Sequence, residues 1–185
     1  MALVHSPSIV TSGLVLCLDA ANRKSYPSPF TGTTWTDLSG NGNNGTLENG
    51  VVYSSGNGGS LSFDGVNDFG LTGNSGITGN NSWSISVWIN VDISENGAGR
   101  QGWILWAGPF FQTNRLLAIS VTGGKIEVSH WANDTIFSNS NITFGNFQNI
   151  RHIYPCHSYC LPSTCRTSRL LFYMDWFLSE PGVTV

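Results

Sequence analysis

The sequence predicts an all-β protein, a sandwich of antiparallel strands. Short alternating apolar runs recur between Gly13 and Ile150, and clusters of Gly and Asn separate them. Charged residues make up only 10 % of the 185 residues, whereas Gly occurs 22 times and Trp seven times. Such a composition suits short strands, tight turns and aromatic anchors, and it leaves no long amphipathic helix. The length fits one domain, residues 1–185, with a core large enough for stability.

The alternating runs place the strands in chain order. We expect strands at residues 14–19, 51–53, 59–64, 83–91, 102–107, 116–121, 125–128 and 135–137. Each run is bounded by Gly, Asn, Ser or Asp, which favour turns because they form local hydrogen bonds or accept left-handed backbone conformations.

Alternation is strictest in the run 83–90 (WSISVWIN). Apolar side chains at 83, 85, 87 and 89 share one face, and the polar residues Ser84, Ser86 and Asn90 share the other. Trp88 is the exception on the polar face. It covers a second apolar surface, or it lies on a concave face where a ligand stacks on it.

The stretch 35–47 (WTDLSGNGNNGTL) is rich in Gly and Asn, so it predicts a structured loop and not a strand. Turn chemistry alone accounts for this composition better than a binding role does. The binding role remains the second interpretation.

Three stretches, 13–22 (GLVLCLDAAN), 35–47 and 60–69 (SLSFDGVNDF), together with the strand 83–90, resemble the laminin-G-like branch of the concanavalin A-like lectin and glucanase superfamily. The resemblance covers about the first 150 residues. It implies a jelly-roll sandwich of two curved antiparallel sheets, whose loops and concave face bind carbohydrate.

The opening, in which residues 3–10 run into GLVLCLD, also resembles virion proteins of tailed bacteriophages. This implies a non-catalytic structural protein on the particle surface, either a capsid decoration or cement protein or a small adhesion module. Its partners would be other virion proteins or copies of itself, and host-surface carbohydrate. The alternative is a lectin-like module of a bacterial surface or secreted protein, located outside the cell.

Residues 1–12 are expected to form an N-terminal arm. Residues 1–10 lack a basic head followed by a long apolar stretch, so we expect no secretory signal, with a removed leader as the alternative. No segment approaches the roughly 20 apolar residues that cross a bilayer. The eight Lys and Arg residues form no cluster and the net charge is -3, which argues against nucleic acid as a partner.

The resemblance implies two kinds of site. Calcium is the cofactor to consider, held by Asp64, Asn67 and Asp68, although Asp-Gly-Val-Asn-Asp is also a good turn in which Asp64 accepts backbone N–H bonds. We favour the turn. The glycan-binding candidates are aromatic and amide or carboxylate side chains: Trp88, His130, Trp131, Asn133 and Asp134. For Trp131 a place in the core is the competing interpretation, because a Trp in a sandwich is more often core than sugar platform.

Catalysis is not expected. Glycosidases on this fold alternate Glu and Asp along one strand so that the carboxylates share a cleft. Here the four Glu residues are isolated, and Glu127 has no acidic residue two positions away. None of the four His residues has an Asp or Ser signature beside it.

The composition changes after residue 150: only one Gly follows, whereas three of the four Cys do. Residues 147–150 begin an expected strand, and 171–176 look like its hairpin partner. The segment 151–170 is atypical. Its Cys156, Cys160 and Cys165, with His152 and His157, allow three interpretations: a zinc site, disulfides that reach Cys17, or a divergent or misread segment with free thiols, which we favour.

Overall fold

The computed structural model of this chain describes residues 12–73, 83–92, 101–107, 117–130, 141–154 and 168–173. Strands dominate these residues, and the only helix among them is η1 (Gly56–Gly58), a single 3-10 turn. The predicted all-β class is therefore confirmed. No helix within the described ranges is long and apolar enough to span a membrane.

Most predicted strands are present with small shifts at their ends. The strands are β1 (Leu14–Asp19), β2 (Thr34–Trp35), β3 (Gly45–Glu48), β4 (Val52–Ser54), β5 (Ser60–Ser62), β6 (Phe69–Thr72), β7 (Trp83–Ile89), β8 (Gln101–Ala107), β9 (Leu117–Thr122), β10 (Lys125–His130), β11 (Gln148–Tyr154) and β12 (Ser168–Tyr173). The expected strand 135–137 lies outside the described residues.

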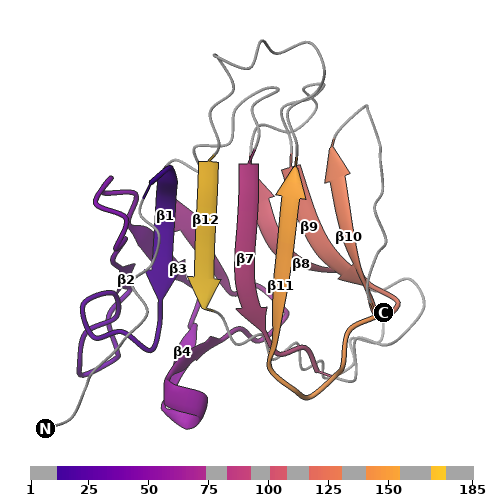
Figure 1. Cartoon of the computed structure of the whole chain (residues 1–185). Helices are drawn as coiled ribbons and strands as arrows, with labels where there is room; N and C mark the ends of the chain where they lie inside the picture. Colours follow the sequence, from indigo (N-terminus) through magenta and orange to yellow (C-terminus); the bar gives the residue numbers. More distant parts are fainter. Residues whose placement is uncertain are drawn as a thin grey trace, which may run out of the picture.

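The strands form several small sheets. A four-stranded sheet has the order β1-β12-β7-β11, and a three-stranded sheet has the order β10-β9-β8. Figure 1 shows the four-stranded sheet in front, with β8 and β9 passing behind β7 and β11, and with β10 to their right. Two smaller sheets have the orders β2-β3-β6 and β4-β5. Every pairing is antiparallel except those of β12, which runs parallel to both β1 and β7.

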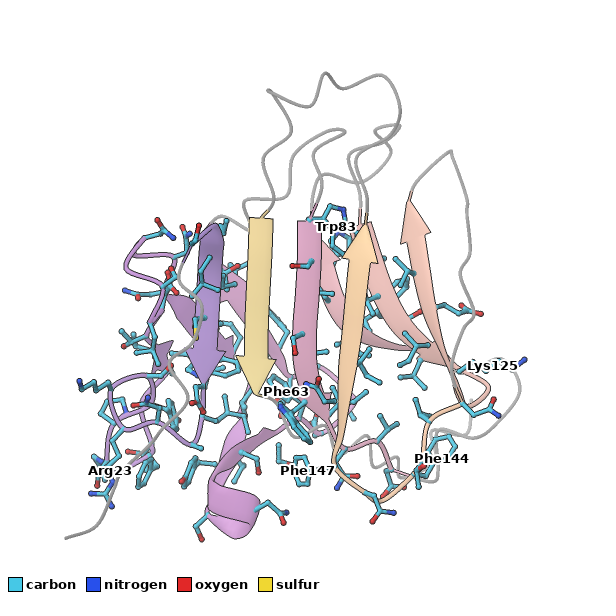
Figure 2. All side chains as sticks on the ribbon, viewed as in Figure 1. Arg23, Phe63, Trp83, Lys125, Phe144 and Phe147 are labelled. Atoms are coloured by element: carbon cyan, nitrogen blue, oxygen red, sulfur yellow. The ribbon has the colours of Figure 1, made fainter. Side chains whose placement is uncertain are left out.

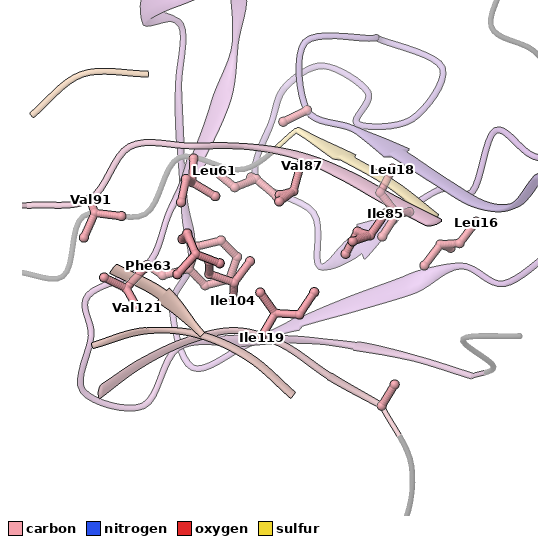
Figure 3. Packing of buried hydrophobic residues seen from close by; sticks show 14 of the residues in the cluster. Leu16, Leu18, Leu61, Phe63, Ile85, Val87, Val91, Ile104, Ile119 and Val121 are labelled. Atoms are coloured by element: carbon pink, nitrogen blue, oxygen red, sulfur yellow. The ribbon is translucent and has the colours of Figure 1, made fainter. Parts of the chain in front are cut away.

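The predicted apolar face of β7 supplies one side of the core. Trp83, Ile85, Val87 and Ile89 are buried, as the alternation predicts. In Figure 3, Ile85 and Val87 point toward Ile119 and Val121, which lie on the opposite side of the cluster. Burial of each such aliphatic side chain contributes about 1.5 to 3 kcal/mol. The core thus joins β7 with the strands behind it.

Two buried aromatic residues lie at opposite ends of this core. Trp83 begins β7, and Phe63 follows β5. Figure 2 places Trp83 at the upper end of the strands and Phe63 near their lower end. Both rings belong to the same buried cluster, so apolar contact extends along the length of the strands.

The Gly- and Asn-rich stretch is a loop over residues 36–44, as predicted, but the short strands β2 and β3 form its two ends. The loop lies along the edge of β1 that faces away from β12. Leu38 N–H donates to the Cys17 carbonyl (2.8 Å), and Cys17 N–H donates to Asp37 Oδ1 (2.9 Å). Asn43 Nδ2 donates to the Val15 carbonyl (3.0 Å). The loop therefore takes the place of a neighbouring strand.

The structure corrects one prediction on strand pairing. The segment 171–176 was expected to form a hairpin with the strand that begins at 147–150, but among the described strands β11 pairs with β7 alone. β12 lies on the other side of β7 and pairs there with β7 and β1. Strand alternation indicates which residues share a face, whereas it carries no information on which strand lies alongside.

Candidate functional site

The predicted calcium residues form a turn between β5 and β6. Asp64 Oδ1 accepts N–H bonds from Val66 (2.8 Å), Asn67 (3.2 Å) and Asp68 (3.4 Å). Asp68 Oδ2 accepts the N–H of Asp64 (3.1 Å). The bond from Val66 is the main reason that the pKa of Asp64 lies below its ordinary value. The geometry is that of the turn interpretation, in which these carboxylates hold the backbone.

This turn offers little to a hard cation. Calcium takes six to eight oxygen ligands, and Asp64 uses one carboxylate oxygen for three backbone donors. In the described part of the chain, no group of three or more His, Cys, Asp or Glu side chains is placed to hold a metal ion. Asp68 Oδ1 is buried without a hydrogen-bond partner.

Trp88 lies on the face of β7 opposite the core, with 37 % of its surface exposed. Asn149 of β11 is its cross-strand partner. The side-chain Nδ2 of Asn149 donates to Ser86 Oγ (3.1 Å) and to the Val87 carbonyl (3.2 Å). A ring face beside a hydrogen-bonded amide and hydroxyl is suited to stacking on a polar ligand with apolar patches, such as a sugar.

The other predicted glycan residues are not brought to Trp88 by the described structure. His130 ends β10, opposite Leu117 of β9, in the sheet behind β7. Trp131, Asn133 and Asp134 lie outside the described residues. Trp88 is therefore the only predicted glycan residue whose side chain the structure describes.

Two exposed features were missed by the sequence interpretation. Trp103 of β8 is as exposed as Trp88. Its ring contacts the ring of Trp106 in a tilted arrangement, with a centroid distance of 5.4 Å. Phe69 and Leu71 of β6 are 47 % and 62 % exposed. The alternation Phe-Gly-Leu-Thr indicates a strand at β6, but the run is only four residues long and follows the Asp64 turn.

Cys17 is buried and free, and its sulfur forms no disulfide. Burial raises the pKa of the thiol to about 11, and the negative charges of Asp19 and Asp37 add to this effect. A thiol with such a pKa is a poor nucleophile and metal ligand near neutral pH. The interpretation that tail cysteines reach Cys17 by a disulfide is therefore wrong for this structure; Cys156, Cys160 and Cys165 lie outside the described residues.

Comparison with known proteins adds no relative. No family model, no curated protein and no solved structure matches this chain.

Proposed function

We propose that this chain is a non-catalytic structural protein of a tailed-phage virion, a laminin-G-like jelly-roll sandwich that packs against neighbouring protein chains on the particle surface. The sequence resemblance supports the family and the setting. The two strand layers that share one core support the sandwich. Within the described residues, side-chain carboxylates such as those of Asp37 and Asp64 serve local structure.

One observation carries the packing role: β6 is an uncharged edge strand with exposed apolar side chains. It pairs with β3 on one side, and no described strand pairs with its other side. Phe69 and Leu71 are both exposed there. Soluble proteins usually protect such edges with charges, Pro or a covering segment, because a bare edge recruits another chain. An edge of this kind suits a protein whose working state is an assembly.

The test is co-sedimentation of the purified chain with particles of the phage whose genome encodes it. We expect the chain to sediment with the particles, and Leu71→Asp to reduce the bound fraction by tenfold or more. Val52→Asp is the matched control, since Val52 is 63 % exposed on β4 and also changes from apolar to acidic. Absence of the wild-type chain from the particle fraction would contradict the proposal.

Glycan binding is a second candidate function, as in a lectin-like module of a bacterial surface or secreted protein. Trp88 favours it, because its exposed ring lies beside the hydrogen-bonded Asn149 and Ser86. On a glycan array we expect Trp88→Ala to lower retention at least tenfold. Trp103→Ala removes an equally exposed indole from another sheet and should leave retention unchanged. Equal losses in both variants, or no retained glycan, would exclude the Trp88 site.

A further inference from the structure

The hydrogen-bonding direction of β3 shows which groups of β6 face its open edge. Leu47 N–H donates to the Thr33 carbonyl (2.6 Å), on the β2 side of β3. Leu47 is the cross-strand partner of Gly70. In an antiparallel pair, hydrogen-bonded and non-hydrogen-bonded positions alternate, so Leu47 and Gly70 form a non-hydrogen-bonded pair. The N–H and C=O of Gly70 therefore face away from β3, toward the open edge.

The two faces of β6 differ. Phe69 and Leu71 are exposed on one face, since side chains alternate along a strand. A Cβ added at Gly70 would point to the other face and would lie 3.7 Å from Leu47 Cδ2. The strand thus combines an apolar outer face, an edge that no described strand covers, with one donor and one acceptor at its centre, and no charged residue between 69 and 72.

We propose that β6 pairs antiparallel with β6 of a second copy of this chain, about a two-fold axis at Gly70. The inference rests on the packing role proposed above and names the partner. With Gly70 opposite Gly70 of the second copy, each N–H donates to the carbonyl of the other. The flanking pairs are Phe69 with the second copy's Leu71 and the reverse. They are non-hydrogen-bonded pairs, in which cross-strand side chains lie closest.

Self-complementarity makes a second copy the fitting occupant. A two-fold contact uses the same surface on both chains, so one patch must match itself. In this register each exposed apolar side chain meets another, and Asp68 falls opposite Thr72, so no carboxylate faces a carboxylate. Two sheets of order β2-β3-β6 become one continuous six-stranded sheet. The contact is short, so the free dimer is weak and becomes populated only at high concentration.

Sedimentation velocity of the full chain, measured from about 10 µM to 1 mM, tests the pairing. We expect the wild-type sedimentation coefficient to rise with concentration. Gly70→Pro removes the N–H that faces the edge while leaving the β3 ladder its bonds, because edge strands accept Pro where the N–H points outward. It should weaken dimerisation at least tenfold, as should Leu71→Asp, which replaces the apolar partner of Phe69.

Two controls keep the test decisive. Gly70→Ala retains the edge N–H and places a methyl group at ordinary contact distance from Leu47, so it should dimerise like the wild type. Val52→Asp should also dimerise normally, although it puts an acid on an equally exposed apolar position. If circular dichroism shows that Gly70→Pro does not fold, the comparison of Leu71→Asp with Val52→Asp tests the β6 pairing instead.

A wild-type chain that stays monomeric throughout, or equal weakening by Leu71→Asp and Val52→Asp, overturns the inference. The two proposals fail separately. A monomer that still sediments with phage particles leaves the virion role standing without the β6 pairing. A dimer that does not associate with particles leaves the β6 pairing standing without the virion role.

Discussion

Asp37 is the residue that ties the Asn-rich loop to β1. Its Oδ1 accepts the N–H groups of Cys17 and Ser39, each at 2.9 Å. Its Oδ2 accepts Ser39 Oγ (2.7 Å) and the N–H of Asn43 (3.0 Å). Burial acts to raise the pKa of this carboxyl, but the four donated bonds outweigh burial and hold the pKa below its ordinary value. The charged form is thus the one that the fold stabilises.

We predict that Asp37→Asn lowers the free energy of unfolding at pH 7 by about 2 kcal/mol, because an amide NH₂ would face the donors of Ser39 and Asn43. The folded-state pKa of Asp37 is below the unfolded value of about 3.8, so its contribution is present above that pH. It is lost as pH falls below 3.8 through the folded pKa. Urea unfolding at pH 7 and pH 3 measures both effects.

Asp64→Asn is the control for this prediction. Asp64 is solvent-exposed, and its bonds join only its own turn, so the variant should lose less stability than Asp37→Asn. An Asp37→Asn chain as stable as the wild type at pH 7 would show that the loop is held by other contacts.

At the scale of elements, η1 meets β5 through a glycine that has no room for a side chain. Gly59 has φ +125°, and a Cβ there would lie 2.7 Å from Tyr53 Oη and 2.9 Å from Ala21 Cα. Gly58 also has a positive φ, +92°, but a Cβ there would meet nothing within 4 Å. Comparing a substitution at Gly59 with the same substitution at Gly58 therefore separates steric overlap from backbone strain.

We predict that Gly59→Ala lowers the free energy of unfolding by about 3 kcal/mol and Gly58→Ala by about 1 kcal/mol. Both variants pay for an unfavourable φ, and only Gly59→Ala adds overlap with the Ala21 backbone, which cannot rotate away. Thermal and urea unfolding of the matched pair give the difference. Equal losses would contradict the close approach of η1 to the segment after β1.

Some elements could be predicted from sequence because their signal is local. The bounds of β1 follow from a short continuous apolar run between Gly13 and Asp19, and the buried face of β7 follows from alternation. β2, β3 and β6 have only two to four residues, too few for a period to show, and the first two border a Gly- and Asn-rich loop. β12 was predicted as a strand, but it was paired with the wrong neighbour, because pairing depends on contacts between distant parts of the chain.

The same limit applies to the candidate site. Trp88 was singled out because it breaks an alternation, and the structure places it on the exposed face. The turn at Asp64 was also foreseen, because Asp followed by Gly and Asn forms such hydrogen bonds locally. The open edge at Phe69 and Leu71 was not, since a strand becomes an edge only when no neighbour takes that side.

At the scale of the whole molecule, the apolar residues divide into two sets. Most apolar residues of the described ranges are in the core shared by β7 and the strands behind it, where exclusion of water stabilises the fold. A smaller set, including Phe69 and Leu71, lies on the surface without contributing to that core. Surface apolar groups on an open strand edge cost solubility unless a partner covers them. This division is the basis of the proposed packing role.

The most direct test of that role is cryo-electron microscopy of phage particles from the source that encodes this chain, with and without its coding sequence. We predict ordered density for the chain at repeated positions on the particle, lost in the deletion, with β6 in contact with another protein chain. Particles whose density is identical in both preparations would contradict the account.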